Sequence, residues 1–140
     1  MESVLAAKGP NVVTIAPDAT IREAVAALVE HNIGALVVIN DQRLPLGIIS
    51  ERDIIRETFT NTSIMDTPVN AVMTRDVVCG SPTDDVEAVL QTMTSQRFRH
   101  VPMVEDGNLV GIVSIGDLVK AQLQDYLGSI DTLQTQLMNS

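Results

Sequence analysis

The sequence is poor in residues on which several classes of protein depend. Its 140 residues include one cysteine, Cys79, so no disulfide can form within the chain, which suits a reducing compartment. With only two histidines besides, the chain has no cluster spaced like the ligands of a metal site. Aromatic side chains are limited to Phe59, Phe98 and Tyr126. A bound ligand is therefore not expected to stack on a wall of aromatic rings.

Basic residues are scarce and long apolar runs are absent. Lys and Arg number 9 against 18 Asp and Glu, which gives a formal charge of −9. This balance argues against nucleic acid or an anionic membrane as the main partner, because both require clustered cations. The longest unbroken apolar run, Ala24–Val29, is far shorter than a membrane span, and no secretory leader opens the chain. We therefore expect a cytoplasmic protein.

One structural unit occurs twice in the chain. An apolar pattern of helical period over Ile21–Leu28 recurs over Val86–Met93, each residue lying 65 positions after its counterpart. Further on, Gly47–Asp53 (Gly-Ile-Ile-Ser-Glu-Arg-Asp) matches Gly111–Asp117 (Gly-Ile-Val-Ser-Ile-Gly-Asp) at an offset of 64. The missing residue falls in a polar turn, where a deletion is best tolerated. The sequence therefore predicts two tandem repeats.

Each repeat reads strand, helix, strand, turn, strand, helix. The expected strands are Val12–Ile15, Ala35–Ile39 and Leu46–Ile49 in the first copy, and Val77–Cys79, His100–Val104 and Leu109–Val113 in the second. Helices are expected from a capping box at Thr20 and Glu23 to about Glu30, over roughly Asp84–Ser95, and from Ser50 and Ser114 onward. Cys79, inside a strand, is expected to be buried. The fold class is α+β, with two three-stranded sheets packed face to face around a pseudo-two-fold axis, because a half of about 60 residues buries too little alone.

The repeated Ser-x-x-Asp at the start of the last helix of each copy has two interpretations. Ser50 and Asp53, like Ser114 and Asp117, fit a helix N-cap followed by an acid in the first turn. The same residues also fit a ligand site, because helix N-termini hold phosphate or hydroxyl oxygens and a carboxylate there can accept both hydroxyls of a ribose. Both interpretations are compatible with one structure.

A second polar signal lies at the start of the middle strand of copy two. Arg97, Arg99 and His100 stand within four residues, in a stretch that has no acid between Glu87 and Glu105. A solvated strand edge explains one such arginine, but three groups beside a helix start favour phosphate binding, where the Arg fork makes bidentate contacts. The matching place in copy one carries no charge, so the two sites should be unequal.

Signals for catalysis are absent, and the C-terminal end is ambiguous. No Gly-x-Ser-x-Gly, phosphate-loop or Cys/His nucleophile pattern is present, so we expect no enzyme activity. Near the end, apolar residues recur at alternating steps of three and four, which hints at a helix seam for self-association. Gly128–Ser129 interrupts that pattern, and core packing or a frayed end explains it equally well. The seam residues are Leu123, Tyr126, Ile130, Leu133 and Leu137.

Together these segments resemble a tandem pair of cystathionine-β-synthase (CBS) domains, also called a Bateman module. The resemblance covers about Val4 to Lys120 and rests mainly on Gly47–Asp53, Arg97–Pro102 and Leu109–Asp117, with Val69–Thr74 resembling the entry segment of such a domain. It divides the chain into repeat 1 with its entry helix (1–60), a linker and entry segment (61–76), repeat 2 (77–122) and a helical tail (123–140).

The resemblance implies a protein that binds adenosine-containing ligands in the clefts between its repeats. AMP or ATP is expected, with NAD(H) as a further possibility and no required cofactor. Carried over by position, Ser50 and Asp53 hold the ribose, while Ile48 contacts the nucleoside together with Ala16, Thr20 and Ile21 of the turn before the first long helix. Arg99 and His100, with Arg97 beside them, reach the phosphate. The pseudo-symmetric site uses Ser114, Asp117, Ile112 and the turn around Ser81, but Gly34 and Ala35 give it no cation.

The same resemblance implies a homodimer that forms a head-to-tail disc, and a regulated protein partner that reads the bound ligand. The leading hypothesis is thus a non-catalytic adenine-nucleotide sensor of the stand-alone bacterial type. A structural or partner-binding module with empty clefts is the alternative, and a nucleotide-processing enzyme is the third.

Overall fold

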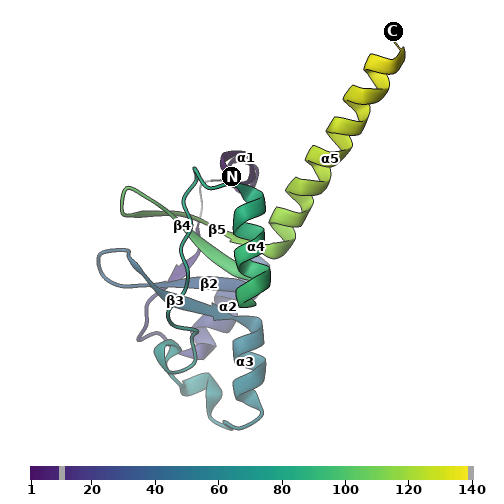
Figure 1. Ribbon diagram of the computed structural model, residues 1–140. Coiled ribbons are helices and arrows are strands. Elements are labelled where there is room, and N and C mark those ends of the chain that lie inside the picture. Colours follow the sequence, from purple (N-terminus) through teal and green to yellow (C-terminus); the bar gives the residue numbers. More distant parts are fainter. Residues whose placement is uncertain (10–11, 139–140) are drawn as a thin grey trace.

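Two copies of one unit follow each other along the chain in the computed structural model, which describes residues 1–9 and 12–138 (Figure 1). The first part comprises α1 (Glu2–Lys8), β1 (Thr14–Ile15), α2 (Ile21–His31), β2 (Ala35–Ile39), β3 (Pro45–Ser50) and α3 (Glu51–Thr58). Two short 3-10 helices, η1 (Ile64–Asp66) and η2 (Val69–Ala71), lead to α4 (Val86–Gln96), β4 (His100–Glu105), β5 (Asn108–Ser114) and α5 (Ile115–Met138). The predicted α+β class and the tandem arrangement are confirmed.

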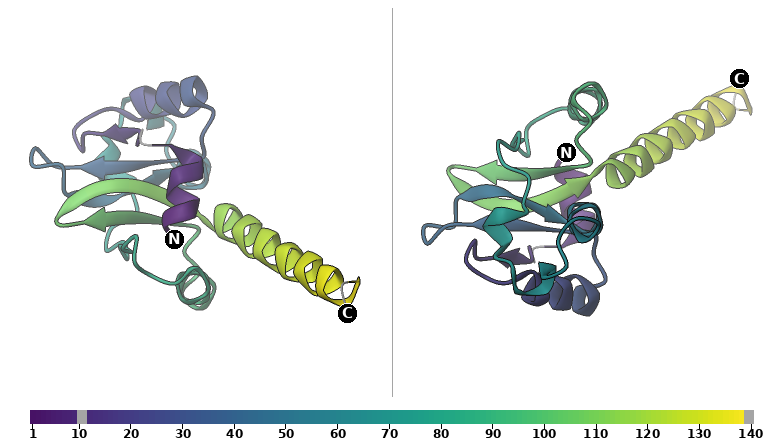
Figure 2. Two further views of the ribbon diagram at one scale, coloured as in Figure 1. Left: turned by 90° about the horizontal axis from the view of Figure 1, so that it is seen from above. Right: turned by 90° about the horizontal axis from the view of Figure 1, so that it is seen from below.

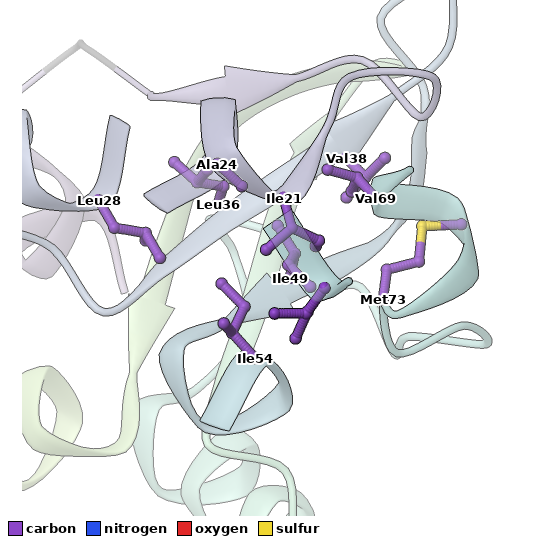
Figure 3. Close-up of a cluster of buried hydrophobic side chains, with 10 residues drawn as sticks. Ile21, Ala24, Leu28, Leu36, Val38, Ile49, Ile54, Val69 and Met73 are labelled. Atoms are coloured by element: carbon purple, nitrogen blue, oxygen red, sulfur yellow. The ribbon is translucent and has the colours of Figure 1, made fainter. Parts of the chain in front are cut away.

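The first repeat folds around α2, which begins where the sequence predicts. The hydroxyl oxygen of Thr20 accepts a hydrogen bond from the backbone N–H of Glu23 at 3.2 Å, and Asn32 ends the helix in the left-handed conformation. β1 pairs parallel with β2, which pairs antiparallel with β3. The buried cluster that joins these elements consists of Ile21, Ala24, Leu28, Leu36, Val38, Ile49, Ile54, Ile64, Val69 and Met73 (Figure 3).

The second sheet has two strands instead of the predicted three. β4 and β5 form a hairpin, but the expected strand Val77–Cys79 is absent and only Gly80 makes a parallel bridge to β4. The N–H of Gly80 donates to the Pro102 carbonyl at 2.9 Å, and the Gly80 carbonyl accepts from Val104 at 2.8 Å. The preceding step of a parallel ladder requires an N–H from residue 102, which proline lacks. The first repeat has Val37 at the matching position, and its ladder continues.

The prediction that Cys79 is buried is wrong for the same reason. Because no strand holds residues 77–79 against the sheet, Cys79 is exposed. Its thiol makes one long contact, at 4.0 Å, to the Val77 carbonyl oxygen.

The two sheets pack face to face, with α2 and α4 on the outer sides (Figure 2). Successive residues of a strand point to opposite faces, yet Leu36, Val37 and Val38 of β2 are all fully buried. Leu36 and Val38 belong to the cluster under α2, so Val37 faces the other sheet. Pro102 of β4 is buried to the same degree. The predicted sheet-to-sheet arrangement is therefore confirmed.

The segments that lead into each repeat pack on the opposite repeat. Val69 and Met73, ahead of the second repeat, belong to the first cluster, whereas Val4 of α1 belongs to the second. The second cluster consists of Val4, Val89, Met93, Val101, Met103, Val113 and Leu118. The buried cores thus extend across the boundary predicted between repeat 1 and the linker, at 60 and 61.

The glycine of each repeated motif permits this exchange of segments. A Cβ on Gly47 would overlap the backbone carbonyl oxygen of Thr74, and a Cβ on Gly111 would lie 2.6 Å from Cδ2 of Leu5. Ile48 exchanges two backbone hydrogen bonds with Thr74, at 3.0 and 2.8 Å. A glycine before that residue leaves the space that the approaching backbone needs.

The final helix differs from the sequence expectation. α5 runs without a break from Ile115 to Met138, through Gly128–Ser129, and its C-terminal part extends away from the sheets (Figure 1). Residues 139–140 of the predicted tail lie outside the described residues. In the part of the chain that the structure describes, no helix is both long and apolar enough to cross a bilayer.

Candidate functional site

A cleft of about 930 Å³ opens between the two repeats, at the end of the sheets where β3 passes into α3 and β4 begins. Six residues predicted to bind ligand line it together: Ile48, Ser50, Asp53, Arg97, Arg99 and His100. The remaining lining residues are Gly34, Glu51, Arg52, Arg56, Thr74, Val77, Met93, Thr94, Gln96, Phe98 and Ile115. Segments about 50 residues apart in the sequence therefore form one concave surface.

The cleft is locally basic in an acidic protein. Four of the nine basic residues of the chain line it, namely Arg52, Arg56, Arg97 and Arg99, against two acids, Glu51 and Asp53. Guanidinium groups around a concave surface attract an anion and offer forked donors to phosphate or carboxylate oxygens. A small anionic ligand fits this distribution of charge.

Ser50 and Asp53 form the predicted capping box at the start of α3. The Ser50 N–H and hydroxyl donate to Asp53 Oδ2 at 3.0 and 2.9 Å, and the Asp53 N–H donates to Ser50 Oγ at 3.1 Å. The other carboxylate oxygen, Oδ1, accepts from the Thr74 hydroxyl at 3.1 Å. The helix-cap interpretation is thus confirmed. Because Asp53 also lines the cleft, its Oδ1 has a lone pair left for a hydroxyl of a ligand.

Arg97 holds an unusual backbone conformation at the edge of the cleft. It ends α4 with φ 61° and ψ 34°, in the left-handed region, where Asn32 ends α2 in the first repeat. Asn tolerates this region, whereas an arginine there costs of order 1 kcal/mol in backbone energy. A cation at a helix C-terminus interacts favourably with the helix dipole, and the Arg97 side chain also lines the cleft.

Arg99 and His100 occupy the backbone positions of Gly34 and Ala35 in the first repeat. The N–H of Ile115 donates to the Arg99 carbonyl at 2.9 Å, as that of Glu51 does to the Gly34 carbonyl at 3.0 Å. The geometry is shared, but only the second repeat carries cationic or titratable side chains there. The predicted difference in charge between the two ligand positions is therefore present, and it comes from the side chains alone.

The surroundings of His100 disfavour its charged form. Burial lowers its pKa below the ordinary value, and the positive charges of Lys8 and Arg99 lower it further, while Asp117 and Glu51 act in the opposite direction. A neutral imidazole in a basic cleft can take up a proton when an anion arrives.

The pseudo-symmetric position is occupied by a side chain of the protein itself. Ser114 and Asp117 repeat the capping box, with N–H to oxygen distances of 2.8 and 3.1 Å, but Lys8 Nζ lies 2.6 Å from Asp117 Oδ2. Burial by itself raises the pKa of Asp117, yet the hydrogen bonds from Lys8 and Ser114 outweigh it and leave the pKa below its usual value. Asp117 and Ile112 do not line the large cleft.

Four predicted contacts lie away from the cleft. Ile21 is fully buried in the first core and its N–H donates to the Thr67 carbonyl, while Thr20 bridges to Pro68. Because β1 runs parallel to β2, the turn after β1 lies at the far end of the strands from Ala35, where the cleft opens. The positions displaced in this way are Ala16, Thr20, Ile21 and, in the second repeat, Ser81.

Sequence reasoning missed the cleft residues that precede Gly80, the residue that bridges to β4 in place of a first strand in the second repeat. Val77 and Thr74 line it, and Thr74 bonds Asp53 directly. A parallel first strand places its entrance, not its exit, beside the start of the second strand. Applied to the second repeat, this rule predicts that residues 74–77 lie at the cleft and that Ser81 does not. Among the described residues, no group of three or more His, Cys, Asp or Glu is placed to hold a metal ion.

Comparison with known proteins gives consistent results for both halves of the chain. Residues 8–59 and 69–124 each match the family model described as the CBS domain. The CBS domain-containing protein YhcV of Bacillus subtilis is 36% identical over 125 residues, which are 89% of each chain.

Solved structures extend the likeness to three dimensions. The CBS-domain containing protein ATU1752 from Agrobacterium tumefaciens superposes with a TM-score of 0.82 at 40% identity, over 87% of this chain and 98% of that one. The CBS domain protein PAE2072 from Pyrobaculum aerophilum, solved in complex with AMP, gives 0.74 at 30% identity, over 83% and 87%.

Proposed function

Because the chain belongs to the CBS-domain family, as a tandem pair, we propose that it is a non-catalytic regulatory module that binds an adenosine nucleotide between its repeats. The observation that carries this proposal is the cleft that joins Ser50 and Asp53 of one repeat to Arg97, Arg99 and His100 of the other. The complex of PAE2072 with AMP supports the class of ligand.

Each part of such a ligand has a suitable group in the cleft. Asp53 Oδ1 accepts from the ribose hydroxyls, where the Thr74 hydroxyl now donates. Ile48, at 6% exposure, offers an aliphatic surface to the adenine in a chain that has few aromatic rings. Arg99 and His100 bind the phosphate from the opposite repeat, and Arg97 stands beside them.

A ligand held this way makes contacts with both repeats at once. It stabilises packings of the two repeats that keep Asp53 and Arg99 at the right separation, and it shifts the population toward them. Such a shift is regulatory when a partner protein binds one packing better than the other. We place this partner, a head-to-tail homodimer and a cytoplasmic location in the same proposal, on the family resemblance alone.

Lys8 makes the second position a poor nucleotide site. Its ammonium group lies 2.6 Å from Asp117 Oδ2, so a ribose at this carboxylate has to compete with an ion pair. We therefore propose one nucleotide for each chain, bound at the Asp53 cleft.

Titration calorimetry with AMP, ATP, NADH and adenosine tests the proposed function. We expect AMP or ATP to bind the wild-type protein, and Asp53→Ala to weaken binding at least ten-fold, since a charged hydrogen-bond acceptor for the ribose is lost. Asp41→Ala, an acid in the exposed β2–β3 turn, is the matched control and should bind as the wild type does.

The outcomes separate the three functional classes. No heat with any adenine ligand at millimolar concentration contradicts the nucleotide module and favours a partner-binding module. Steady conversion of ATP or NADH by pure protein, abolished in Asp53→Ala, would instead establish an enzyme.

A further inference from the structure

The C-terminal part of α5 carries a regular apolar stripe outside the buried cores. Leu118, near the start of the helix, is fully buried in the second cluster, and beyond it the helix extends away from the body of the protein (Figures 1 and 2). Val119, Leu123, Tyr126, Ile130 and Leu133 follow at steps of four, three, four and three residues. Their exposed fractions run from 38% to 69%. We call these five residues the α5 seam.

The spacing of the α5 seam is that of a two-stranded coiled coil. Alternating steps of three and four keep apolar side chains in line along one edge of a helix, where a second helix can pack. Gly128 lies on the opposite side, half a turn from the centre of the seam. The glycine that seemed to interrupt the pattern therefore leaves the seam intact.

The extended part of α5 is also expected to be only marginally stable without a partner. With Gly128, Ser129, Thr132 and Thr135, the extended part has low intrinsic helix propensity. A segment of this length is marginal as an isolated helix in water, so burial of its apolar stripe has to supply the missing stability. Exposed apolar residues that form one continuous stripe are typical of an interaction surface, whereas single ones need no explanation.

The charges around the α5 seam identify the partner as another copy of the chain. A second copy carries the same charge of −9, so electrostatic repulsion opposes its approach least where acids are absent. The positions that flank the seam hold Lys120, Gln122, Leu127, Ser129 and Gln134, with no acid among them. Asp125 and Asp131, the two acids of this part of the helix, lie about a third of a turn from the seam centre, outside those flanks. A lipid surface would require several cations bordering the stripe, and only Lys120 is present.

We propose that the α5 seam pairs with the α5 seam of a second copy to form a two-stranded coiled coil. This contact does not depend on nucleotide binding, and it uses a surface separate from the sheets and the cleft. It gives the chain a self-association element outside its two repeats.

Cysteine cross-linking in a Cys79→Ser background tests the proposal on the full chain. In a parallel pair, Ile130→Cys should form a disulfide with itself under mild oxidation. In an antiparallel pair centred on Gly128, it should instead cross-link to Tyr126→Cys when the two variants are mixed. Gln124→Cys, on the outer face, is the matched control and should stay monomeric on a non-reducing gel.

A second pair of variants measures the effect on association. Ile130→Asp should raise the dissociation constant of the seam contact by at least ten-fold in sedimentation equilibrium, whereas Gln124→Asp should leave it unchanged. Circular dichroism with thermal unfolding verifies that both variants fold. The proposal is overturned if neither seam cysteine cross-links above the level of Gln124→Cys, even if the protein dimerises through another surface.

Discussion

Arg99 differs from its counterpart in the first repeat only by its side chain. The backbone carbonyls of Arg99 and Gly34 accept equivalent hydrogen bonds, at 2.9 and 3.0 Å, so the local fold does not require an arginine. Arg99 is among the residues that line the cleft proposed for the nucleotide. Its contribution should therefore appear in binding and not in folding.

Arg99→Ala should weaken AMP far more than adenosine. Loss of a charge-assisted hydrogen bond costs about 2 kcal/mol, or roughly thirty-fold in Kd for AMP, while adenosine should change less than about three-fold. Calorimetry with both ligands measures the difference, and Arg43→Ala in the exposed β2–β3 turn is the control. Equal losses for AMP and adenosine would remove the phosphate role.

His100 should make AMP binding depend on pH. Its pKa is lowered in the free protein, chiefly by burial, and a bound phosphate raises it, so complex formation takes up a proton. The preference for AMP over adenosine should therefore increase as the pH falls from 8 toward 6. His100→Gln should keep only the pH dependence of the phosphate, whose second pKa is near 6. Identical pH profiles for the two proteins would contradict the contact.

At the scale of the elements, each lead-in segment depends on a glycine in the opposite repeat. Gly47 lies under the backbone of Thr74, which cannot retract without moving its neighbour Met73 out of the first core. Gly111 lies under the side chain of Leu5, which can rotate. The two glycines thus occupy equivalent positions, but Gly111 should tolerate an added side chain better than Gly47 does.

Gly47→Ala should lower the free energy of unfolding by about 1–3 kcal/mol, because the added methyl group overlaps a backbone carbonyl. Gly111→Ala should cost less, since only the end of a leucine has to move. Gly128→Ala, with open space around the position, should be neutral or stabilise the helix by up to about 1 kcal/mol. Urea unfolding of the three variants measures the order of their free energies of unfolding. A Gly47→Ala protein as stable as the wild type would refute the close approach.

The element boundaries predicted from the sequence hold where local patterns decide them. The helix α2 and the hairpins β2–β3 and β4–β5 follow from apolar period and turn residues, and Asp106–Gly107 adopts the positive φ values of a tight turn. The strand predicted at Val77–Cys79 fails because its partner strand contains Pro102, a residue distant in sequence. The strand propensity of residues 77–79 carries no information about the backbone N–H that Pro102 lacks in the partner strand.

For the whole molecule, the pseudo-symmetry produces two positions with different occupants. The Asp53 position opens into the 930 Å³ cleft, and the Asp117 position holds the ammonium group of Lys8. The ion pair is partly exposed, so it contributes at most about 1 kcal/mol to stability. The main effect of the Lys8–Asp117 ion pair should instead be to limit the number of nucleotides that one chain binds.

Lys8→Ala should raise the adenosine stoichiometry from one toward two for each chain, because the competing ammonium group beside Asp117 is removed. Adenosine is the suitable probe, since this position has no other cation for a phosphate. Lys120→Ala, on an exposed turn of α5, should leave the stoichiometry at one. Titration calorimetry measures whether one or two adenosines bind to each chain. Two bound adenosines in the wild type would show that Lys8 does not block the position.

The sequence by itself determined the two repeats, the α+β class, the helix N-caps and the basic stretch at Arg97–His100, because each depends on spacing within a short segment. Only the tertiary structure decided which of these residues meet. The parallel direction of β1 in the first repeat and of the Gly80 bridge in the second placed Ala16 and Ser81 at the far end of the sheets, and Thr74 and Val77 at the cleft. The packing of α1 on the second repeat placed Lys8 against Asp117, 109 residues away. Such contacts depend on strand direction and on the exchange of lead-in segments, and neither leaves a local pattern in the sequence.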